Sequence, residues 1–277
     1  DAAEGRAQLG AEALHDGERG LHWFEALADH LGEAYLRYSF TKGTENEVAF
    51  LVDVLGLEPG DRVLDVGCGP GRHAHALGEL GIQVHGVDVS QRFVDLARVD
   101  APDGVTFERA DARALAFSEE FDAVISLCQG AFGLASGGPH IDRQGPIAPA
   151  VLVAETSDPD PDARVLDGMA RSLRPGGRLA VSAFSAYFQV RWLEETDSFD
   201  ADAGVNHERT ALRSPAGEEA THDLWTTCFT PRELRLLAAR SGLDVRDIWS
   251  VTPGAYARRR PDLDHPELLM VALRPAA

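Results

Sequence analysis

The feature that most constrains this chain is a glycine-rich turn between a predicted strand and a predicted helix. A β-rich run at residues 62–66 leads into Gly-Cys-Gly-Pro-Gly at residues 67–71, and a helical pattern follows at residues 73–80. Glycine has no β-carbon, so backbone N–H groups in such a turn can approach a ligand closely. The N-terminus of the following helix adds partial positive charge. The turn therefore predicts a strand–loop–helix unit that holds a ligand.

Strand and helix patterns alternate along much of the chain. β-Rich runs lie at residues 62–66, 82–87, 105–109, 121–127 and 178–184, and helical patterns lie at residues 73–80, 90–99 and 165–173. This alternation predicts a parallel sheet with helices on both faces and right-handed crossovers. Four conspicuous residues end or follow the predicted strands: Gly67, Asp88, Asp111 and Cys128. Since ligands of such sheets bind beyond the carboxyl ends of the strands, we expect the binding site at this edge.

The N-terminal part of the chain is expected to be helical. Apolar residues near helical spacing at residues 21–38 predict one amphipathic helix. Thr44, with Glu47 three residues later, has the pattern of a capping box and predicts a second helix through Leu55. We expect residues 1–43 to form a helical cover and residues 44–277 to form the main α/β domain.

Two segments interrupt the alternation. Residues 136–162 are rich in Gly, Pro and Asp, which predicts a long loop over the ligand-binding edge. Two alternating runs, residues 205–213 and 221–229, flank a Ser-Pro-Ala-Gly turn and predict an antiparallel hairpin within an insert at about residues 185–229. A helix is then predicted from Pro231 to Arg240, followed by the last strands, residues 243–251 and 268–273.

Composition and charge exclude several classes of protein. The 277 residues suit one large α/β domain. Acidic residues outnumber basic residues 45 to 26, and this net charge of −19 argues against a nucleic acid or an anionic membrane as a partner. No apolar run approaches the ~20 residues of a membrane-spanning helix, and no signal peptide is visible. Three scattered cysteines, Cys68, Cys128 and Cys228, favour reduced thiols and a cytoplasmic location.

Acidic residues after the second and third predicted strands suit a nucleoside ligand. Asp88 can accept two hydrogen bonds from ribose hydroxyls. Asp111 and Ala112 stand where an acceptor can meet the amino group of adenine. The glycine spacing is G-x-G-x-G, and Arg72 stands where the dinucleotide fingerprint has its last glycine. A nicotinamide-dependent oxidoreductase is therefore kept only as an alternative.

Taken together, these motifs resemble those of the class I S-adenosylmethionine-dependent methyltransferases. The resemblance covers roughly residues 44–184 and the C-terminal strands, and it rests on five features: the D-V-G-C-G-P-G loop at 65–71, Asp88, the Asp111-Ala112 pair, the strand at 121–127 and L-R-P-G-G at 173–177. It implies a seven-stranded, mostly parallel Rossmann-like sheet with an N-terminal helical cover and an antiparallel insert. It also implies S-adenosyl-L-methionine as cofactor and S-adenosyl-L-homocysteine as product.

The resemblance also implies a set of cofactor-binding residues. They are Tyr38, Gly67, Cys68, Gly69, Asp88, Val89, Asp111, Ala112 and Cys128. In this family the glycines of the loop would face the methionine moiety, the acid after the second strand would hold the ribose, and Val89 would touch adenine. Cys128 would lie near the sulfonium, and Tyr38 would close over the cofactor.

The acceptor side is less clearly marked by the sequence. A general base is needed if the attacking atom carries a proton that must leave. The candidates are His207 with Glu208, His222 with Asp223, His140 and Tyr256, and Gln129 is a candidate hydrogen-bonding partner of the acceptor. His207 and His222 lie on the two strands of the predicted hairpin, and we take them as the predicted catalytic residues.

These observations predict methyl transfer to an N, O or C atom of a small-molecule acceptor. A non-catalytic S-adenosylmethionine-binding module remains a further alternative, because the binding residues are better marked than the catalytic residues. No metal is expected, since His73 and His75 are two residues apart on a predicted helix and point to different faces.

Overall fold

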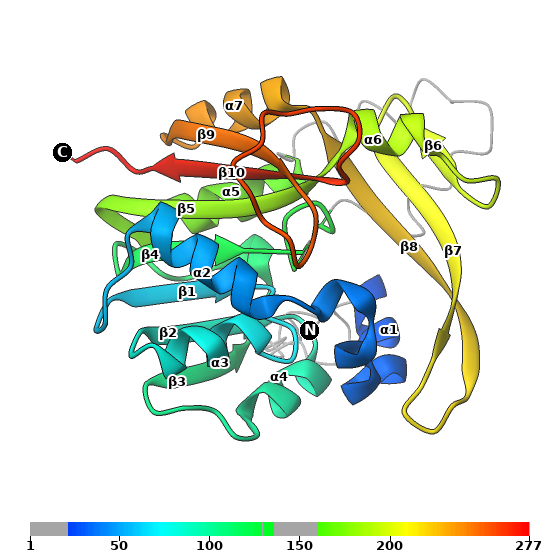
Figure 1. Ribbon diagram of the computed structural model, residues 1–277, viewed down its shortest axis with the longest axis horizontal. Coiled ribbons are helices and arrows are strands. Elements are labelled where there is room, and N and C mark those ends of the chain that lie inside the picture. The colour runs from blue at the N-terminus through cyan, green and yellow to red at the C-terminus, as the bar shows by residue number, and fades with distance from the viewer. Residues whose placement is uncertain (1–21, 129, 136–159, 277) are drawn as a thin grey trace, which may run out of the picture.

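The computed structural model describes residues 22–128, 130–135 and 160–276 (Figure 1). Most of the long loop predicted at residues 136–162 lies outside the described residues, as do the candidate residues Gln129 and His140. No helix of the described part of the chain is both long enough and apolar enough to cross a bilayer.

A mostly parallel sheet forms the centre of the molecule (Figure 1). Its strands are β1 (Arg62–Val66), β2 (Gln83–Asp88), β3 (Val105–Arg109), β4 (Phe121–Ser126), β5 (Leu173–Ser185), β9 (Asp244–Val251) and β10 (Glu267–Leu273). The spatial order is β3-β2-β1-β4-β5-β10-β9; the first five strands are parallel, and β10 is antiparallel to both of its neighbours. The fold class predicted from the alternation and from the family resemblance is confirmed.

Helices cover both faces of this sheet. They are α2 (Thr44–Leu55), α3 (Arg72–Glu79), α4 (Gln91–Arg98), α5 (Pro161–Ser172) and α7 (Pro231–Arg240). Neighbouring residues of β1 enter different cores because strand side chains alternate between faces. Val63 packs with α2 and α3 through Leu51 and Leu77, whereas Leu64 shares the other core with Met169 of α5. The glycine-rich turn thus begins from a strand that is buried on both sides.

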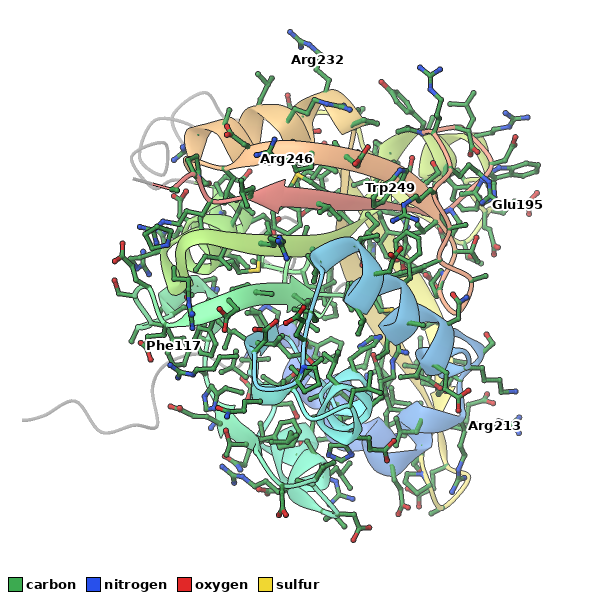
Figure 2. All side chains as sticks on the ribbon, turned by 60° about the vertical axis from the view of Figure 1, so that its left-hand side comes forward. Phe117, Glu195, Arg213, Arg232, Arg246 and Trp249 are labelled. Atoms are coloured by element: carbon green, nitrogen blue, oxygen red, sulfur yellow. The ribbon has the colours of Figure 1, made fainter. Side chains whose placement is uncertain are left out.

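The insert after β5 forms the predicted hairpin. Helix α6 (Ala186–Arg191) and strand β6 (Ser198–Asp200) precede β7 (Val205–Arg213) and β8 (Glu219–Phe229), which pair antiparallel. The end of β8 joins the main sheet through a short parallel pairing of Cys228 with Phe184. The hairpin therefore extends from the sheet toward the N-terminal helices, and Figure 2 shows Arg213 near its far end.

The N-terminal cover differs from the single predicted helix. Helix α1 (Trp23–Leu31) ends at Gly32, and 3-10 turns follow as η1 (Gly32–Arg37) and η2 (Ser39–Thr41). Gly32 has a positive φ of 44°, a conformation that glycine adopts readily and that stops an α-helix. The cover packs on the hairpin, where Leu27 and Leu31 contact Leu212.

The predicted capping box at the start of α2 is wrong. The N-cap is Gly43 with a φ of 96°, and Thr44 is already the first helical residue. Glu47 does not reach back to the helix start; it is fully buried and bound to residues of other elements. Gly43 is required here because a β-carbon would lie 2.5 Å from the carbonyl oxygen of Gly254. Tertiary contacts therefore replace the local cap.

Candidate active site

The glycine turn follows β1 and is bound to the end of the neighbouring strand β2. The amides of Gly67 and Cys68 both donate to the carbonyl of Val87, at 2.8 and 3.0 Å. Gly67 and Gly69 have φ values of 74° and 53°, so both positions favour glycine. A β-carbon at Gly67 would collide with the backbone of Gly130, whereas the nearest atom to a β-carbon at Gly69 is Cε1 of Tyr35, at 3.9 Å. Gly67 thus permits a close backbone contact, and Gly69 keeps space open for a ligand.

Asp88 ends β2 and is held rigidly beside this turn. Its Oδ2 accepts from the amide of Gly69 at 2.9 Å, and its Oδ1 accepts from the amide of Ser90 at 2.8 Å. Burial raises the pKa of Asp88 to about 6, although these two hydrogen bonds act in the opposite direction. Because each carboxylate oxygen can accept a second hydrogen bond, Asp88 suits a pair of ribose hydroxyls.

A narrow hollow lies beyond Asp88, at the ends of β2 and β3. It is lined by Phe24, Val89, Ala110, Ala112 and Leu134, with Asp111 at one side. The carboxylate of Asp111 accepts from Nε of Arg113 at 2.9 Å and from Nη2 of the same residue at 2.6 Å. Burial raises the pKa of Asp111, but these hydrogen bonds outweigh it and hold the pKa below its ordinary value. Apolar walls beside a fixed acceptor suit the adenine expected there.

A larger cavity of about 320 Å³ lies between the glycine turn, the N-terminal cover and the hairpin. Gly69 and Cys128 line it from the sheet edge, and Tyr35 and Tyr38 line it from the cover. Asp88 borders both this cavity and the narrow hollow, so the two spaces adjoin. Together they provide an apolar adenine end, a carboxylate at the ribose position and a wide chamber beyond it. The residues present therefore fit S-adenosylmethionine.

The two cysteines of the predicted site lie in different surroundings. Cys68 is buried in the core, with its Sγ close to Gly86 of β2, and its side chain lines neither the hollow nor the cavity. Cys128 follows β4 with a φ of 50° and does line the cavity. Burial raises the pKa of the Cys128 thiol well above its ordinary value, so it stays protonated. The predicted proximity of Cys128 to the cofactor thus has a geometric basis, whereas Cys68 lines neither space and its predicted contact stays a prediction.

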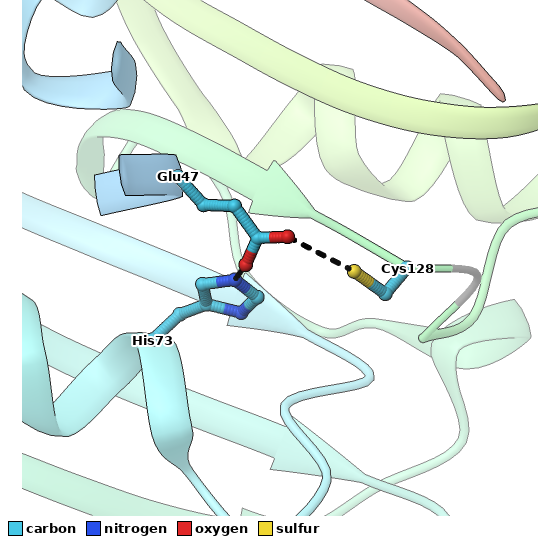
Figure 3. Close-up of side chains that lie close together, drawn as sticks. All are labelled: Glu47, His73 and Cys128. Atoms are coloured by element: carbon cyan, nitrogen blue, oxygen red, sulfur yellow. Dashed lines mark hydrogen bonds and ion pairs between the residues drawn. The ribbon is translucent and has the colours of Figure 1, made fainter. Parts of the chain in front are cut away.

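A buried charged cluster lies behind the turn, and Figure 3 shows three of its members. Glu47 binds the guanidinium of Arg72, and its Oε2 lies 2.7 Å from Nε2 of His73. Its Oε1 accepts from the amide of Gly254 at 2.7 Å. Burial raises the pKa of Glu47, but His73 and Arg72 together lower it to about 2. One ionised carboxylate thus connects α2, α3 and the segment after β9.

This cluster also contains a donor set that a transition metal can use. Donor atoms of Glu47, His73 and Cys128 lie within 4.8 Å of one another. However, Nη2 of Arg72 lies 2.8 Å from Sγ of Cys128, and the same guanidinium binds Glu47. Since the guanidinium already occupies the space between these donors, the cluster acts as an ion-paired support for the turn.

The two histidines predicted to be catalytic do not line the cavity. Nε2 of His207 lies 2.8 Å from Oδ1 of Asp223, and its ring stacks on Trp225. Adjacent strand residues point to opposite faces, so it is Glu208 that faces the cavity. His222 lies further along the hairpin, where its ring packs against His30 at 4.9 Å. Neither histidine lines the cavity in which the acceptor is expected, and their catalytic role stays a prediction.

Several cavity residues were not predicted from the sequence. Glu267, at the start of β10, is 1% exposed and lines the cavity, as do Phe184, Leu212 and Leu224. The sequence does contain a signal for Glu267, because an acid opens the otherwise apolar strand ELLMVAL. Tyr256, a candidate base, is instead buried in the core beside Phe50.

Comparisons with known proteins agree with this geometry. A family model described as a methyltransferase domain matches residues 63–135. The ubiquinone biosynthesis O-methyltransferase of Cupriavidus pinatubonensis is 26% identical over 196 residues, which cover 70% of this chain and 64% of that protein. The 27-O-demethylrifamycin SV methyltransferase of Amycolatopsis mediterranei is 31% identical over 185 residues, or 64% of this chain and 53% of that protein. The CcbJ methyltransferase structure from Streptomyces caelestis matches with a TM-score of 0.67 and 20% identity, over 93% of this chain and 98% of that chain.

The fold and the glycine turn define a Rossmann-like methyltransferase domain. The comparisons bear out the resemblance to the class I S-adenosylmethionine-dependent methyltransferases seen in the sequence, and they support S-adenosylmethionine as the cofactor that it implied. The matched regions span 64% and 53% of the two curated relatives, so the chain spans about half to two thirds of their length.

Proposed function

We propose that the protein transfers a methyl group from S-adenosylmethionine to an N, O or C atom of a small-molecule acceptor in the larger cavity. The observation that carries this proposal is the position of Asp88, which borders both the narrow hollow and the cavity of about 320 Å³. The names of the two relatives, which refer to ubiquinone biosynthesis and to a rifamycin, support a small organic acceptor. When bound, the cofactor supplies an electrophilic methyl group on a positively charged sulfur.

The chain's own residues have distinct roles in this proposal. Asp88 accepts hydrogen bonds from the ribose, and Asp111 and Ala112 border adenine. Tyr38 closes the cavity from the side of the cover. Exclusion of water and a fixed orientation of the two reactants supply much of the rate enhancement in such a chamber. Where the attacking atom carries a proton, Glu208 is the cavity carboxylate on the hairpin that can accept it at Oε.

The proposal gives each part of the chain a role. Residues 1–43 contain the cover over the cofactor, and residues 44–277 contain the methyltransferase domain. The insert at about residues 185–229 provides the acceptor wall, through Leu212 and Leu224 of the hairpin.

Isothermal titration with S-adenosylhomocysteine tests the proposal. The wild-type protein is expected to bind it, and Asp88→Ala should weaken binding at least about tenfold, because charge-assisted hydrogen bonds to the ribose are lost. Asp95→Ala is the matched control, since its carboxylate is 59% exposed on α4. Absence of binding to the wild-type protein contradicts the proposal, as does equal loss in both variants. A parallel titration with NADH tests the oxidoreductase alternative.

A further inference from the structure

The larger cavity has walls that are mainly apolar. Trp23 and Leu27 come from α1, Phe93 from α4, Phe184 from the end of β5, and Leu212 and Leu224 from the hairpin. Such walls suit an acceptor with a substantial apolar body, because burying that body removes apolar surface from water.

The charged side chains that line the cavity are all acidic. Its described lining includes the carboxylates of Asp88, Glu208 and Glu267, and it includes no lysine, arginine or histidine. Asp88 is engaged by the glycine turn. Glu267 begins β10 and pairs with Phe184 of β5, which places it at the sheet edge of the cavity. Glu208 is therefore the carboxylate on the acceptor side.

Glu208 differs from Asp223 and Glu219 of the same hairpin in having no ion-pair partner among the described residues. Among the described residues, no arginine, lysine or histidine forms an ion pair with Glu208. On the same hairpin, Asp223 pairs with Arg209, and Glu219 pairs with Arg213. The charges that do act on Glu208 are those of Asp197 and Glu194, which are negative. The acceptor side of the cavity thus carries uncompensated negative charge.

This arrangement selects among acceptor chemistries. A carboxylate or phosphate on the acceptor would be repelled by Glu208, whereas an ammonium group would gain a charge-assisted hydrogen bond. Building on the proposed function, we infer that the acceptor is an amine with an apolar body, and that the carboxylate of Glu208 binds its ammonium group.

The same contact prepares the amine for reaction. An ammonium nitrogen has no free lone pair, so it must first lose a proton. The Glu208 carboxylate takes that proton onto one oxygen, which leaves a neutral amine and a neutral carboxylic acid. Burial, with the charges of Asp197 and Glu194, raises the pKa of Glu208 and so favours this transfer. Thr210, which hydrogen-bonds Glu208, opposes the shift.

Binding of three probes with one apolar body tests the inference directly. We would titrate 4-phenylbutylamine, 4-phenylbutanol and 4-phenylbutyrate into the wild-type protein saturated with S-adenosylhomocysteine. The amine is expected to bind at least about tenfold more tightly than the alcohol, and the carboxylate more weakly than both. An amine that binds no better than the alcohol, or does not bind, overturns the inference.

Variants assign the preference to Glu208. Glu208→Gln should reduce amine affinity about tenfold or more and leave the affinities for the alcohol and for S-adenosylhomocysteine unchanged. Glu208→Asp should retain part of the preference for the amine, and it is the variant to measure if Glu208→Gln does not fold. Glu219→Gln is the matched control on the same hairpin, because that carboxylate is 56% exposed. Unchanged amine affinity in Glu208→Gln overturns the inference.

The first titration separates this inference from the proposed function. If the wild-type protein does not bind S-adenosylhomocysteine, the proposed function fails and the inference falls with it. If it binds that nucleoside but shows no preference for the amine, only the inference fails.

Discussion

The carboxylate of Asp88 accepts a hydrogen bond from the amide of Gly69 at 2.9 Å, although 19 residues separate them in the chain. This contact joins the turn after β1 to the end of β2, and it aims the carboxylate at the space where the ribose is expected. One side chain therefore both positions the turn and offers acceptors to the ligand. The amide of Ser90 holds the other carboxylate oxygen.

Cofactor affinity is expected to depend on the ionisation of Asp88. Burial raises the pKa of this carboxyl to about 6. As the pH falls through that value, Asp88 gains a proton and becomes a poorer acceptor for ribose hydroxyls. The affinity for S-adenosylhomocysteine should therefore fall by up to about tenfold per pH unit below the pKa. Titrations between about pH 5 and pH 8 measure this, and a flat profile in the wild-type protein would contradict it. Asp88→Asn should remove the dependence.

Asp65 in β1 is expected to lower stability at neutral and alkaline pH. Its carboxyl is 1% exposed, its Oδ2 has no hydrogen-bond partner among the described residues, and burial raises its pKa from 3.8 to about 7. The unfolded chain ionises Asp65 at lower pH than the folded chain does. The contribution of Asp65 to the free energy of unfolding is thus fully present below about pH 4, where the carboxyl is neutral in both states, and it is lost as the pH rises to about 7.

Asp65→Asn tests this linkage through thermal or denaturant unfolding. At about pH 8 the free energy of unfolding of the variant should exceed that of the wild-type protein by roughly 1–3 kcal/mol. The reason is that asparagine has nearly the same shape as aspartate but carries no charge to bury. Little difference is expected at about pH 4, where both side chains are neutral. If the variant gains more stability at about pH 4 than at about pH 8, the predicted pH dependence has the wrong direction.

The two glycines of the turn should respond differently to alanine. Gly67→Ala should destabilise the fold by about 3 kcal/mol or more, because the new β-carbon collides with the backbone of Gly130. Gly69→Ala should cost only about 1–2 kcal/mol, the strain of its φ of 53°, since its β-carbon has room. That β-carbon would, however, occupy space in the cavity and weaken binding of S-adenosylhomocysteine. Equal unfolding free energies for the two variants would refute this distinction.

The ion pair between Glu47 and Arg72 should show strong coupling. Glu47 is fully buried and the Arg72 side chain is 11% exposed, so Glu47→Leu leaves a buried guanidinium without its carboxylate and should cost about 3–5 kcal/mol. Glu47→Leu combined with Arg72→Met should cost less than the sum of the single changes, because no unpaired charge remains. The double-mutant cycle needs the unfolding free energies of the wild-type protein, of Glu47→Leu, of Arg72→Met and of the double variant. Additive costs would mean that the pair is not coupled.

Local patterns were sufficient to predict most of the elements. The strand at residues 105–109 and the helix from Pro231 to Arg240 lie as expected, because the periods of their apolar residues match the faces that they bury. The predicted N-cap Ser90 does accept from the amide of Phe93. Gly32 shows the limit of periodicity, since the apolar pattern runs past the residue at which the helix ends.

The acceptor side required the tertiary structure. His207 and Glu208 are adjacent in sequence, and only the register of β7 against β8 and the packing of the cover decide which one faces the cavity. The sequence pattern predicts a local capping role for Glu47, but its partners lie on α3 and after β9, far away in the chain.

The sequence by itself determined the order of strands and helices along the chain, and it placed Asp88 at the edge of the sheet where the ribose is expected. These depend on side-chain periodicity and on glycines at a turn, which act over a few residues. Only the tertiary structure decided which faces of the insert and the cover enclose a cavity and which buried charges find partners. These outcomes depend on contacts between distant segments, because a side chain's burial and electrostatic surroundings are set by every element that packs around it.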